Sequence, residues 1–245
     1  TVSTERTALI SVICDDSADD SDVKGILSVT QYPAADLVDF KFSEDGTAVD
    51  VSPRQNTIRS YTKAVKMNYY EEYASWGPTV SRTANSGPKL DAQAVWFCEY
   101  TSFEDKIDDG YTIESVFSIP AAHTNVETKA FGATNKGGFA LMLGDTKEKT
   151  HPDGTKVKRS GSIEFIQHGD GNWNFGVTDV VPVPGQLYHV FGVWDGQTIK
   201  CYVDGKLKCT YGVKTLKHAQ ITPRHLAVAG NYNGETSFNG AWNGS

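Results

Sequence analysis

The chain has 245 residues, of which 39% are hydrophobic and 22% are charged, so it can bury one large core or two small ones. Its 30 acidic and 23 basic side chains give a net charge of −7, which argues against a broad electrostatic grip on nucleic acid or an anionic membrane. The longest apolar run, Ala8 to Cys14, is far shorter than the roughly 20 residues of a membrane-spanning helix.

The first 34 residues are predicted to form an N-terminal extension or linker. Ala8 to Cys14 fits one strand, and the run from Asp15 to Asp22 then holds five carboxylates in eight residues. A calcium-binding loop would need a glycine at its turning position and a closing glutamate, and this run has neither. We interpret it as a solvated acidic loop. The remaining residues, 35–245, are predicted to form one β-sandwich.

From residue 36 onward, short apolar runs and turn signals recur at regular spacing. Asp-Gly pairs at 195–196 and 204–205 separate alternating runs, which is a strong hairpin signal. The lysine-rich stretch 146–157 is interpreted as a polar loop, and no stretch has the pattern of a long helix. Strands are expected at 37–42, 111–119, 137–143, 162–167, 174–180, 187–194, 198–203 and 207–211. The pattern predicts an all-β fold, an antiparallel sandwich or barrel.

Four cysteines, at positions 14, 98, 201 and 209, match neither a zinc motif nor a disulfide scaffold. One pair is nevertheless of interest. If the hairpin loop is the three-residue Asp204–Lys206, Cys201 lies opposite Cys209 and a disulfide between them is expected. If the loop is only Asp204–Gly205, Cys201 instead faces Lys208 and the bridge is lost.

The sequence lacks the common catalytic motifs of hydrolases and nucleotide-binding enzymes. Glu114 and Glu164 each stand on a predicted strand without the second carboxylate that glycoside hydrolysis requires. The triplet Ile166–His168 is faintly similar to the Gln-Ile-His of sandwich alginate lyases, but the arginine-rich strand that should accompany it is missing. We therefore expect no enzymatic activity from this chain and no required cofactor.

The stretch Tyr188 to Lys208 resembles the signature of laminin-G-like, concanavalin A-like lectin/glucanase domains. In that family an aromatic-His-Val strand leads through Trp-Asp-Gly to a Tyr-Val-Asp-Gly hairpin. Residues 109–115 look like its earlier Phe-Thr-Ile-Glu-Ala strand, and residues 226–234 with 238–240 are similar to its late Ile-Gly-Gly and Phe-x-Gly elements. The resemblance implies an antiparallel jelly roll of two packed sheets.

A narrower resemblance covers Ala35 to Pro53, which looks like the opening of the laminin-G-like domain appended to bacterial calcineurin-like metallophosphoesterases and other surface proteins. The metal motifs of the phosphoesterase are not in this chain. Domains of this family end on a long strand, and the residues after Trp242 cannot supply one. We therefore expect a sandwich that lacks its last strand, unless Ala8–Cys14 fills that place or the natural chain continues.

Two predicted loops, His168–Asn174 and Asn231–Glu235, combine an aromatic ring with amide or carboxylate groups, as a sugar site requires. Trp173 is the predicted platform, with Tyr232 second, and Asp170, Asn172 and Asn231 are the predicted polar contacts. These polar groups would also suit a structural Ca²⁺, whose presence is left open, or plain turn formation. Trp173 could equally pack back on its own sandwich.

These features favour a non-catalytic binding module for a glycan or cell-surface polysaccharide. It is expected to be part of a larger bacterial protein that is extracellular, periplasmic or on the cell surface. Other domains of that parent chain are its expected partners, and nucleic acid is not. Two alternatives remain: a divergent sandwich-fold polysaccharide hydrolase or lyase, and a structural or protein-docking domain of a multidomain phosphoesterase.

Overall fold

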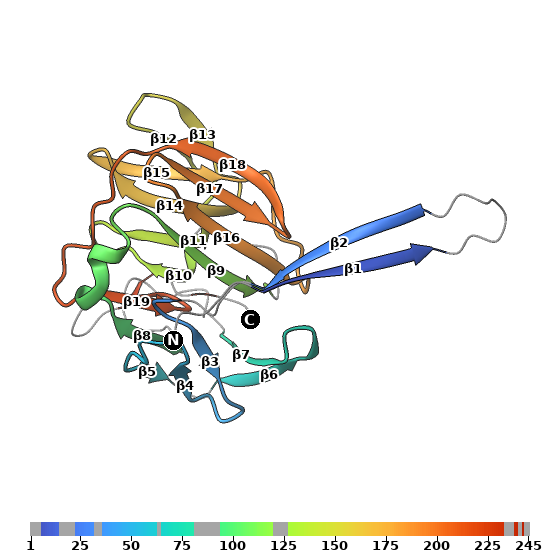
Figure 1. The fold of residues 1–245 in the computed structure, drawn as a ribbon. Helices are drawn as coiled ribbons and strands as arrows, with labels where there is room; N and C mark the ends of the chain where they lie inside the picture. The colour runs from blue at the N-terminus through green and yellow to red at the C-terminus, as the bar shows by residue number, and fades with distance from the viewer. Residues whose placement is uncertain are drawn as a thin grey trace.

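The computed structural model describes residues 6–14, 23–31, 36–62, 65–80, 94–119, 127–232, 238–239 and 242. Within these ranges the chain is built from antiparallel strands and two short 3-10 segments, η1 (Glu71–Tyr73) and η2 (Thr101–Lys106). The predicted all-β class is confirmed, and the arrangement is an antiparallel β-sandwich (Figure 1).

Two sheets form the sandwich. The large sheet has the strand order β15-β14-β11-β10-β19-β8-β5, and the small sheet has the order β18-β17-β16-β9. The large sheet consists of β5 (Arg59–Thr62), β8 (Ala94–Glu99), β10 (Thr128–Ala133), β11 (Phe139–Leu143), β14 (Ile163–Gly169), β15 (Asn172–Val177) and β19 (His225–Val228). The small sheet consists of β9 (Tyr111–Phe117), β16 (Tyr188–Trp194), β17 (Thr198–Val203) and β18 (Lys206–Gly212).

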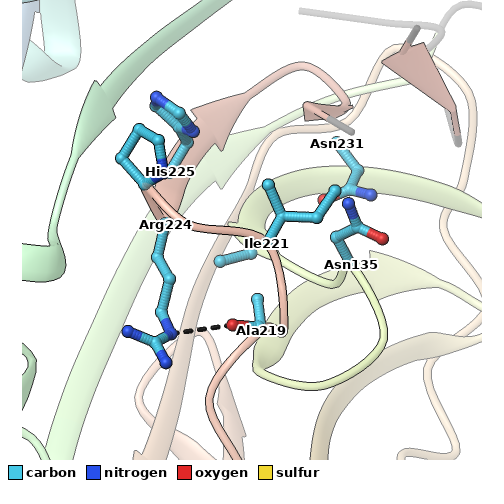
Figure 2. Close-up of a pocket in the computed structure, with 8 residues that line it drawn as sticks. Asn135, Ala219, Ile221, Arg224, His225 and Asn231 are labelled. Atoms are coloured by element: carbon cyan, nitrogen blue, oxygen red, sulfur yellow. Dashed lines mark hydrogen bonds between the residues drawn. The ribbon is translucent and has the colours of Figure 1, made fainter. Parts of the chain in front are cut away.

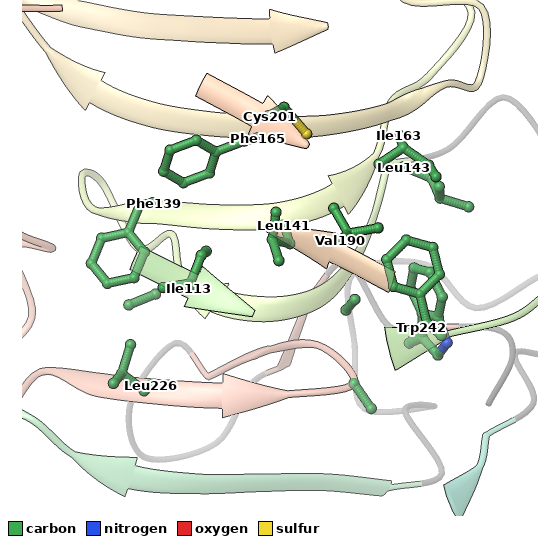
Figure 3. Close-up of a cluster of buried hydrophobic side chains, with 14 of the residues drawn as sticks. Ile113, Phe139, Leu141, Leu143, Ile163, Phe165, Val190, Cys201, Leu226 and Trp242 are labelled. Atoms are coloured by element: carbon green, nitrogen blue, oxygen red, sulfur yellow. The ribbon is translucent and has the colours of Figure 1, made fainter. Parts of the chain in front are cut away.

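The core lies between the inner faces of these two sheets (Figure 3). Alternate residues of each strand point inward, so Leu141 and Phe165 of the large sheet meet Val190 of the small sheet, and all three are fully buried. The sheets approach closely at Gly192, where an added Cβ would lie 2.6 Å from the ring of Phe165. Gly192 is therefore a packing requirement rather than a turn.

A second group of four strands covers one end of the sandwich. It consists of β3 (Phe40–Phe42), β4 (Ala48–Asp50), β6 (Lys66–Tyr70) and β7 (Ser75–Thr79), in the order β4-β3-β7-β6. Its rings are inserted against the large sheet: Phe42 packs edge-on to Trp96 at 5.0 Å, and Phe40 packs edge-on to Phe131 at 6.1 Å. These aromatic contacts attach the four-strand group to the core.

The N-terminal strands pair only with each other. β1 (Arg6–Cys14) and β2 (Val23–Gln31) form a two-stranded hairpin that projects away from the sandwich in Figure 1. Within the described residues, Ala8–Cys14 pairs with β2 and not with a strand of the sandwich, so it does not take the place of the expected last strand. The acidic run 15–22 and the predicted boundary at residue 35 lie outside the described residues. Near the C-terminus, β20 (Asn231–Tyr232) pairs with β21 (Phe238–Asn239).

The predicted polar loop 146–157 contains a further hairpin, formed by β12 (Glu148–Thr150) and β13 (Lys156–Lys158). The backbone N–H of His151 donates to the carbonyl of Thr155, and the imidazole of His151 stacks on the ring of Tyr211 at 3.8 Å. The loop interpretation was therefore wrong. The polar sequence carries no strand signal here, and the stacking of His151 on Tyr211 stabilises the hairpin.

The β17–β18 hairpin corrects the disulfide prediction. Its turn is the two-residue Asp204–Gly205, with positive φ at both positions, and Val203 pairs with Lys206. A β-bulge beyond Tyr202 then places Cys201 opposite Cys209 after all. Both cysteines are nevertheless free thiols. Opposed residues hold their Cβ atoms about 4.5–5.5 Å apart, wider than the roughly 3.8 Å of a disulfide, so register alone does not bridge them.

Candidate functional site

Trp173 lies in a strand, not in the loop that the sequence predicted. The turn between β14 and β15 is only Asp170–Gly171, whose φ angles of 51° and 84° suit a tight hairpin. Trp173 is the second residue of β15 and pairs with His168 across the hairpin. The two rings meet edge-on at 5.1 Å, and Trp173 remains partly exposed on the outer face of the large sheet.

The outer face beneath Trp173 is apolar. Ala140, Met142 and Ile166 are buried there, and Trp173 and Phe175 pack against them from β15. This small cluster lies on the side of the sheet opposite to the main core. The indole ring is therefore supported from below while part of it stays accessible to solvent.

The polar residues of the predicted site mainly serve the hairpin itself. The Asp170 carboxylate accepts hydrogen bonds from the Lys214 backbone N–H at 2.9 Å and from the Thr215 hydroxyl at 3.0 Å. The side-chain oxygen of Asn172 accepts from the Trp173 N–H at 2.8 Å. These contacts match the turn-forming alternative, and they also hold the segment after β18 beside the platform.

That segment, residues 213–220, runs across one end of the large sheet. The Lys217 N–H donates to the carbonyl of His168 at 2.8 Å, and the Lys217 carbonyl accepts from the Gly138 N–H at 2.6 Å. The Gln220 N–H donates to the carbonyl of Asn135. The three stretches 134–138, 168–172 and 213–220 therefore form one hydrogen-bonded edge beside Trp173, which we call the rim.

Asn231 contacts the far end of the rim, at Thr134, and not Trp173. It is buried, and its side-chain oxygen accepts from the Thr134 N–H at 2.9 Å, close to β10. β10 and β15 are three strand spacings apart, at about 4.8 Å each. Tyr232 pairs with Phe238 in the β20–β21 ladder, and its side chain lies outside the described residues. The structure therefore does not combine the two predicted loops into one site.

A small cavity opens next to Asn231 (Figure 2). Its volume is about 10 Å³, which suits one water molecule and no sugar. The side-chain nitrogen of Asn135 is buried there without a hydrogen-bond partner, so it has a proton to offer such a water. Arg224 closes one side, its Nε donating to the carbonyl of Ala219 at 2.7 Å.

A larger cleft of about 210 Å³ lies by the β3–β4 turn, outside every prediction from the sequence. It is lined by residues 45–48 together with Ile58, Ser60 and Trp96. Trp96 is fully buried and its indole N–H donates to the carbonyl of Gly46, so it presents no open ring face to a ligand. Trp173 remains the better platform.

Next to the apolar cluster, the outer face carries a buried charge network that sequence reasoning missed. Arg159 is fully buried, and its guanidinium donates from Nε and Nη2 to the equally buried carboxylate of Glu164 at 2.7–2.9 Å. It also contacts Glu127 and lies over the ring of Phe175 at 5.0 Å. A glutamate within an otherwise apolar strand was the one signal in the sequence.

The ion pair with Arg159 gives Glu164 a structural role. Burial raises the pKa of Glu164 to about 7, and the hydrogen bonds and charge of Arg159 oppose that rise. For Glu127 burial also raises the pKa, but the charge of Arg159 and its hydrogen bond outweigh burial, so the net pKa is lowered. A carboxylate held by a buried guanidinium is poorly placed to act on a substrate.

The other residues considered for catalysis are also engaged. The side chain of Gln167 points into the core, where its oxygen accepts from the Tyr111 hydroxyl at 2.6 Å and its nitrogen donates to the carbonyl of Thr215. Glu114 pairs with His189 at 2.5 Å on the outer face of the small sheet. In the described part of the chain, both side chains are thus engaged with other protein groups.

Within the described ranges, no group of three histidine, cysteine, aspartate or glutamate side chains is placed to hold a metal ion. The helices of the described chain are all too short or too polar to cross a membrane. The structural Ca²⁺ that the sequence left open stays a prediction.

Comparison with known proteins identifies the family. A laminin G family model, described as the concanavalin A-like lectin/glucanases superfamily, matches residues 101–243. The match covers more than half of the chain, so the chain belongs to this family, as the strand and turn motifs indicated. No curated protein matches it by sequence.

Solved structures with the same fold are distant in sequence. The receptor-binding domain of botulinum neurotoxin mosaic serotype C/D is 12% identical, with a TM-score of 0.54, and the match covers 84% of this chain and 48% of that one. The binding domain of botulinum neurotoxin DC in complex with SialylT is 10% identical, with a TM-score of 0.52, covering 78% and 42%. The binding domain of Paraclostridial Mosquitocidal Protein 1 is 10% identical, with a TM-score of 0.50, covering 82% and 47%. This chain spans less than half of each, so the likeness concerns the fold.

Proposed function

We propose that this chain is a non-catalytic carbohydrate-binding module and that a sugar ring stacks on Trp173. The observation that carries the proposal is the position of this indole. It is partly exposed on the outer face of the large sheet, meets His168 edge-on and packs against the apolar cluster of that face. A rigid, supported aromatic surface is what stacking on a pyranose requires.

Polar groups for the sugar hydroxyls come from the rim. The Asp170–Asn172 turn leads directly into Trp173, and Thr215 is held against that turn by hydrogen bonds with Asp170. A pre-ordered edge lowers the entropy cost of binding. Asn231 and Tyr232 are left out of this site, because Asn231 is buried near β10.

A binding role agrees with the described carboxylates. Glu164 is tied to Arg159, and Glu114 pairs with His189, so neither has a carboxylate partner across a substrate-sized space. Several domains of the same fold carry binding in their names, among them one in complex with SialylT. We propose that the module works outside the cytoplasm or on the cell surface, in a larger protein, without a required cofactor.

The test removes the aromatic ring of Trp173. Trp173→Ala should lower glycan affinity about thirtyfold, which corresponds to about 2 kcal/mol for a stacked aromatic anchor, and should leave the fold intact. A glycan array followed by calorimetry on the best ligand measures the loss, and circular dichroism checks the fold. Tyr69→Ala is the matched control, because Tyr69 is an exposed ring on the distant strand β6.

Unchanged affinity in folded Trp173→Ala protein would overturn the site. If that variant does not fold, Trp173→Phe keeps the packing with a smaller ring and should still weaken binding. Release of reducing sugar or unsaturated product from a polysaccharide panel would instead favour an enzyme. A blank glycan array with a positive partner pull-down would favour a docking domain.

A further inference from the structure

The rim beside Trp173 carries three exposed lysines. Lys136 stands in the β10–β11 turn, and Lys214 and Lys217 stand in the segment that crosses the end of the sheet. None of the three forms an ion pair with a carboxylate in the part of the chain that the structure describes. Three ammonium groups without a partner make this edge electropositive.

The backbone fixes the positions of these lysines. Lys217 is hydrogen-bonded through its N–H to His168 and through its carbonyl to Gly138, and the Lys214 N–H is held by Asp170. Gly137 packs so closely that an added Cβ would lie 2.4 Å from the carbonyl oxygen of His218. The Lys217 charge is felt at His168, whose pKa is lowered by burial and then by that charge. His168 is the residue that contacts Trp173.

Two carboxylates lie near the rim. Asp170 accepts hydrogen bonds from the Lys214 backbone N–H and the Thr215 hydroxyl, which are neutral donors and do not offset its charge, and Asp108 pairs with His218 at 2.7 Å. The charge of the rim is also unlike that of the whole chain. The stretches 134–138, 168–172 and 213–220 hold three lysines against one carboxylate, a net charge of +2, whereas the full chain carries −7.

We propose that the ligand of the Trp173 site is an anionic glycan that bears a carboxylate, as in sialic acid or a uronic acid. This inference rests on the proposed carbohydrate-binding function and specifies its substrate class. The sugar ring lies on the indole, and the carboxylate of the ligand lies at the three rim lysines, which outnumber the single rim carboxylate, Asp170. Placing an ammonium against a carboxylate favours acidic over neutral sugars of the same shape.

The experiment compares matched pairs of ligands. 3′-Sialyllactose is measured against lactose, and trigalacturonate against galactotriose, so the two sources of the carboxylate are separated. The acidic member of at least one pair should bind about tenfold more tightly or better. The preference should shrink between about 0.05 M and about 0.5 M NaCl, because salt screens exposed charges.

A triple variant assigns the preference to the rim. Lys136→Gln, Lys214→Gln and Lys217→Gln together should reduce the acidic ligand's affinity to that of its neutral partner and leave neutral binding unchanged. Lys66→Gln, Lys158→Gln and Lys206→Gln form the matched control, because these lysines are also exposed and lie on β6, β13 and β18, away from the rim. The control variant should keep the preference.

The outcomes separate the two proposals. Equal binding of acidic and neutral ligands, or a preference that survives the rim variant, overturns the anionic-ligand inference. The carbohydrate-binding function would still stand in that case if Trp173→Ala lost affinity. Absence of binding to every acidic and neutral ligand on the panel and the array overturns both.

Discussion

Arg159 forms a fully buried ion pair on the outer face of the large sheet. Its side chain has no solvent exposure, and neither has that of Glu164, which it contacts through two nitrogens. Such a pair gains little relative to an apolar pair of the same shape, because both ions are desolvated. Removing one member alone is different, since the other charge is left buried without compensation.

We expect Arg159→Met to lower the free energy of unfolding by about 3–5 kcal/mol. Chemical denaturation measures the loss. Lys149→Met is the control: Lys149 meets Glu127 and Asp145 at 3.7 and 3.8 Å but is one-third exposed, so its loss should cost at most about 1 kcal/mol. Adding Glu164→Leu to Arg159→Met should recover part of the stability, and equal effects of Arg159→Met and Lys149→Met would contradict this account.

At the scale of an element, Asp50 holds the end of β4 to the chain around it. Its carboxylate accepts hydrogen bonds from the backbone N–H groups of Asp39, Ser52 and Asn56 at 2.7–3.0 Å. The side chains of Ser52 and Asn56 donate to it as well. Burial raises the pKa of Asp50, but these donors together outweigh burial, and the net pKa lies below its ordinary value of 3.8.

Asp50→Asn should therefore cost about 2 kcal/mol at neutral pH, because one oxygen that faces donors becomes an NH₂ group. The stability that a lowered carboxyl pKa supplies is present above about 3.8 and is lost as the pH falls through the folded-state pKa. The difference between wild type and variant should thus shrink toward zero at low pH. Urea denaturation across the pH range measures it, with Asp109→Asn as control, because Asp109 is an exposed carboxylate.

Elements with local signals were predictable from the sequence. Asp-Gly turns and alternating apolar residues located the β14–β15, β16–β17 and β17–β18 hairpins and the inward-facing side of β9. The bulge that sets Cys201 against Cys209 was not predictable, because an extra residue in one strand leaves no mark in the pattern. The β12–β13 hairpin was missed for a related reason, since the stacking of His151 on Tyr211 is a tertiary contact.

The candidate site was predictable only in part. An aromatic ring among Gly, Asn and Asp residues marked Trp173, although it stands on a strand. Asn231 looked equivalent in sequence but is buried near β10, three strands away. The rim lysines are unremarkable singly, and only the segment 213–220, folded across the sheet end, brings two of them beside the third.

At the scale of the whole molecule, the two projecting hairpins differ in how they pack against the sandwich. The β12–β13 hairpin is packed: His151 contacts Tyr211 and Phe175, and Lys149 reaches Glu127. The β1–β2 hairpin has no strand partner other than itself. A two-stranded hairpin on its own is marginally stable in water, so it contributes little to the sandwich.

Removing residues 1–34 should therefore leave the rest of the chain folded. We expect the free energy of unfolding to change by less than about 1 kcal/mol, a shift in Tm of less than about 4 °C for a domain of this size, and Trp173-dependent glycan binding to persist. Calorimetry on the shortened chain measures both. Replacing residues 147–158 with a short glycine linker should instead lower Tm clearly, because it removes the contacts of His151 and Lys149. Loss of the cooperative transition on removing 1–34 would mean that the N-terminal hairpin completes the sandwich after all.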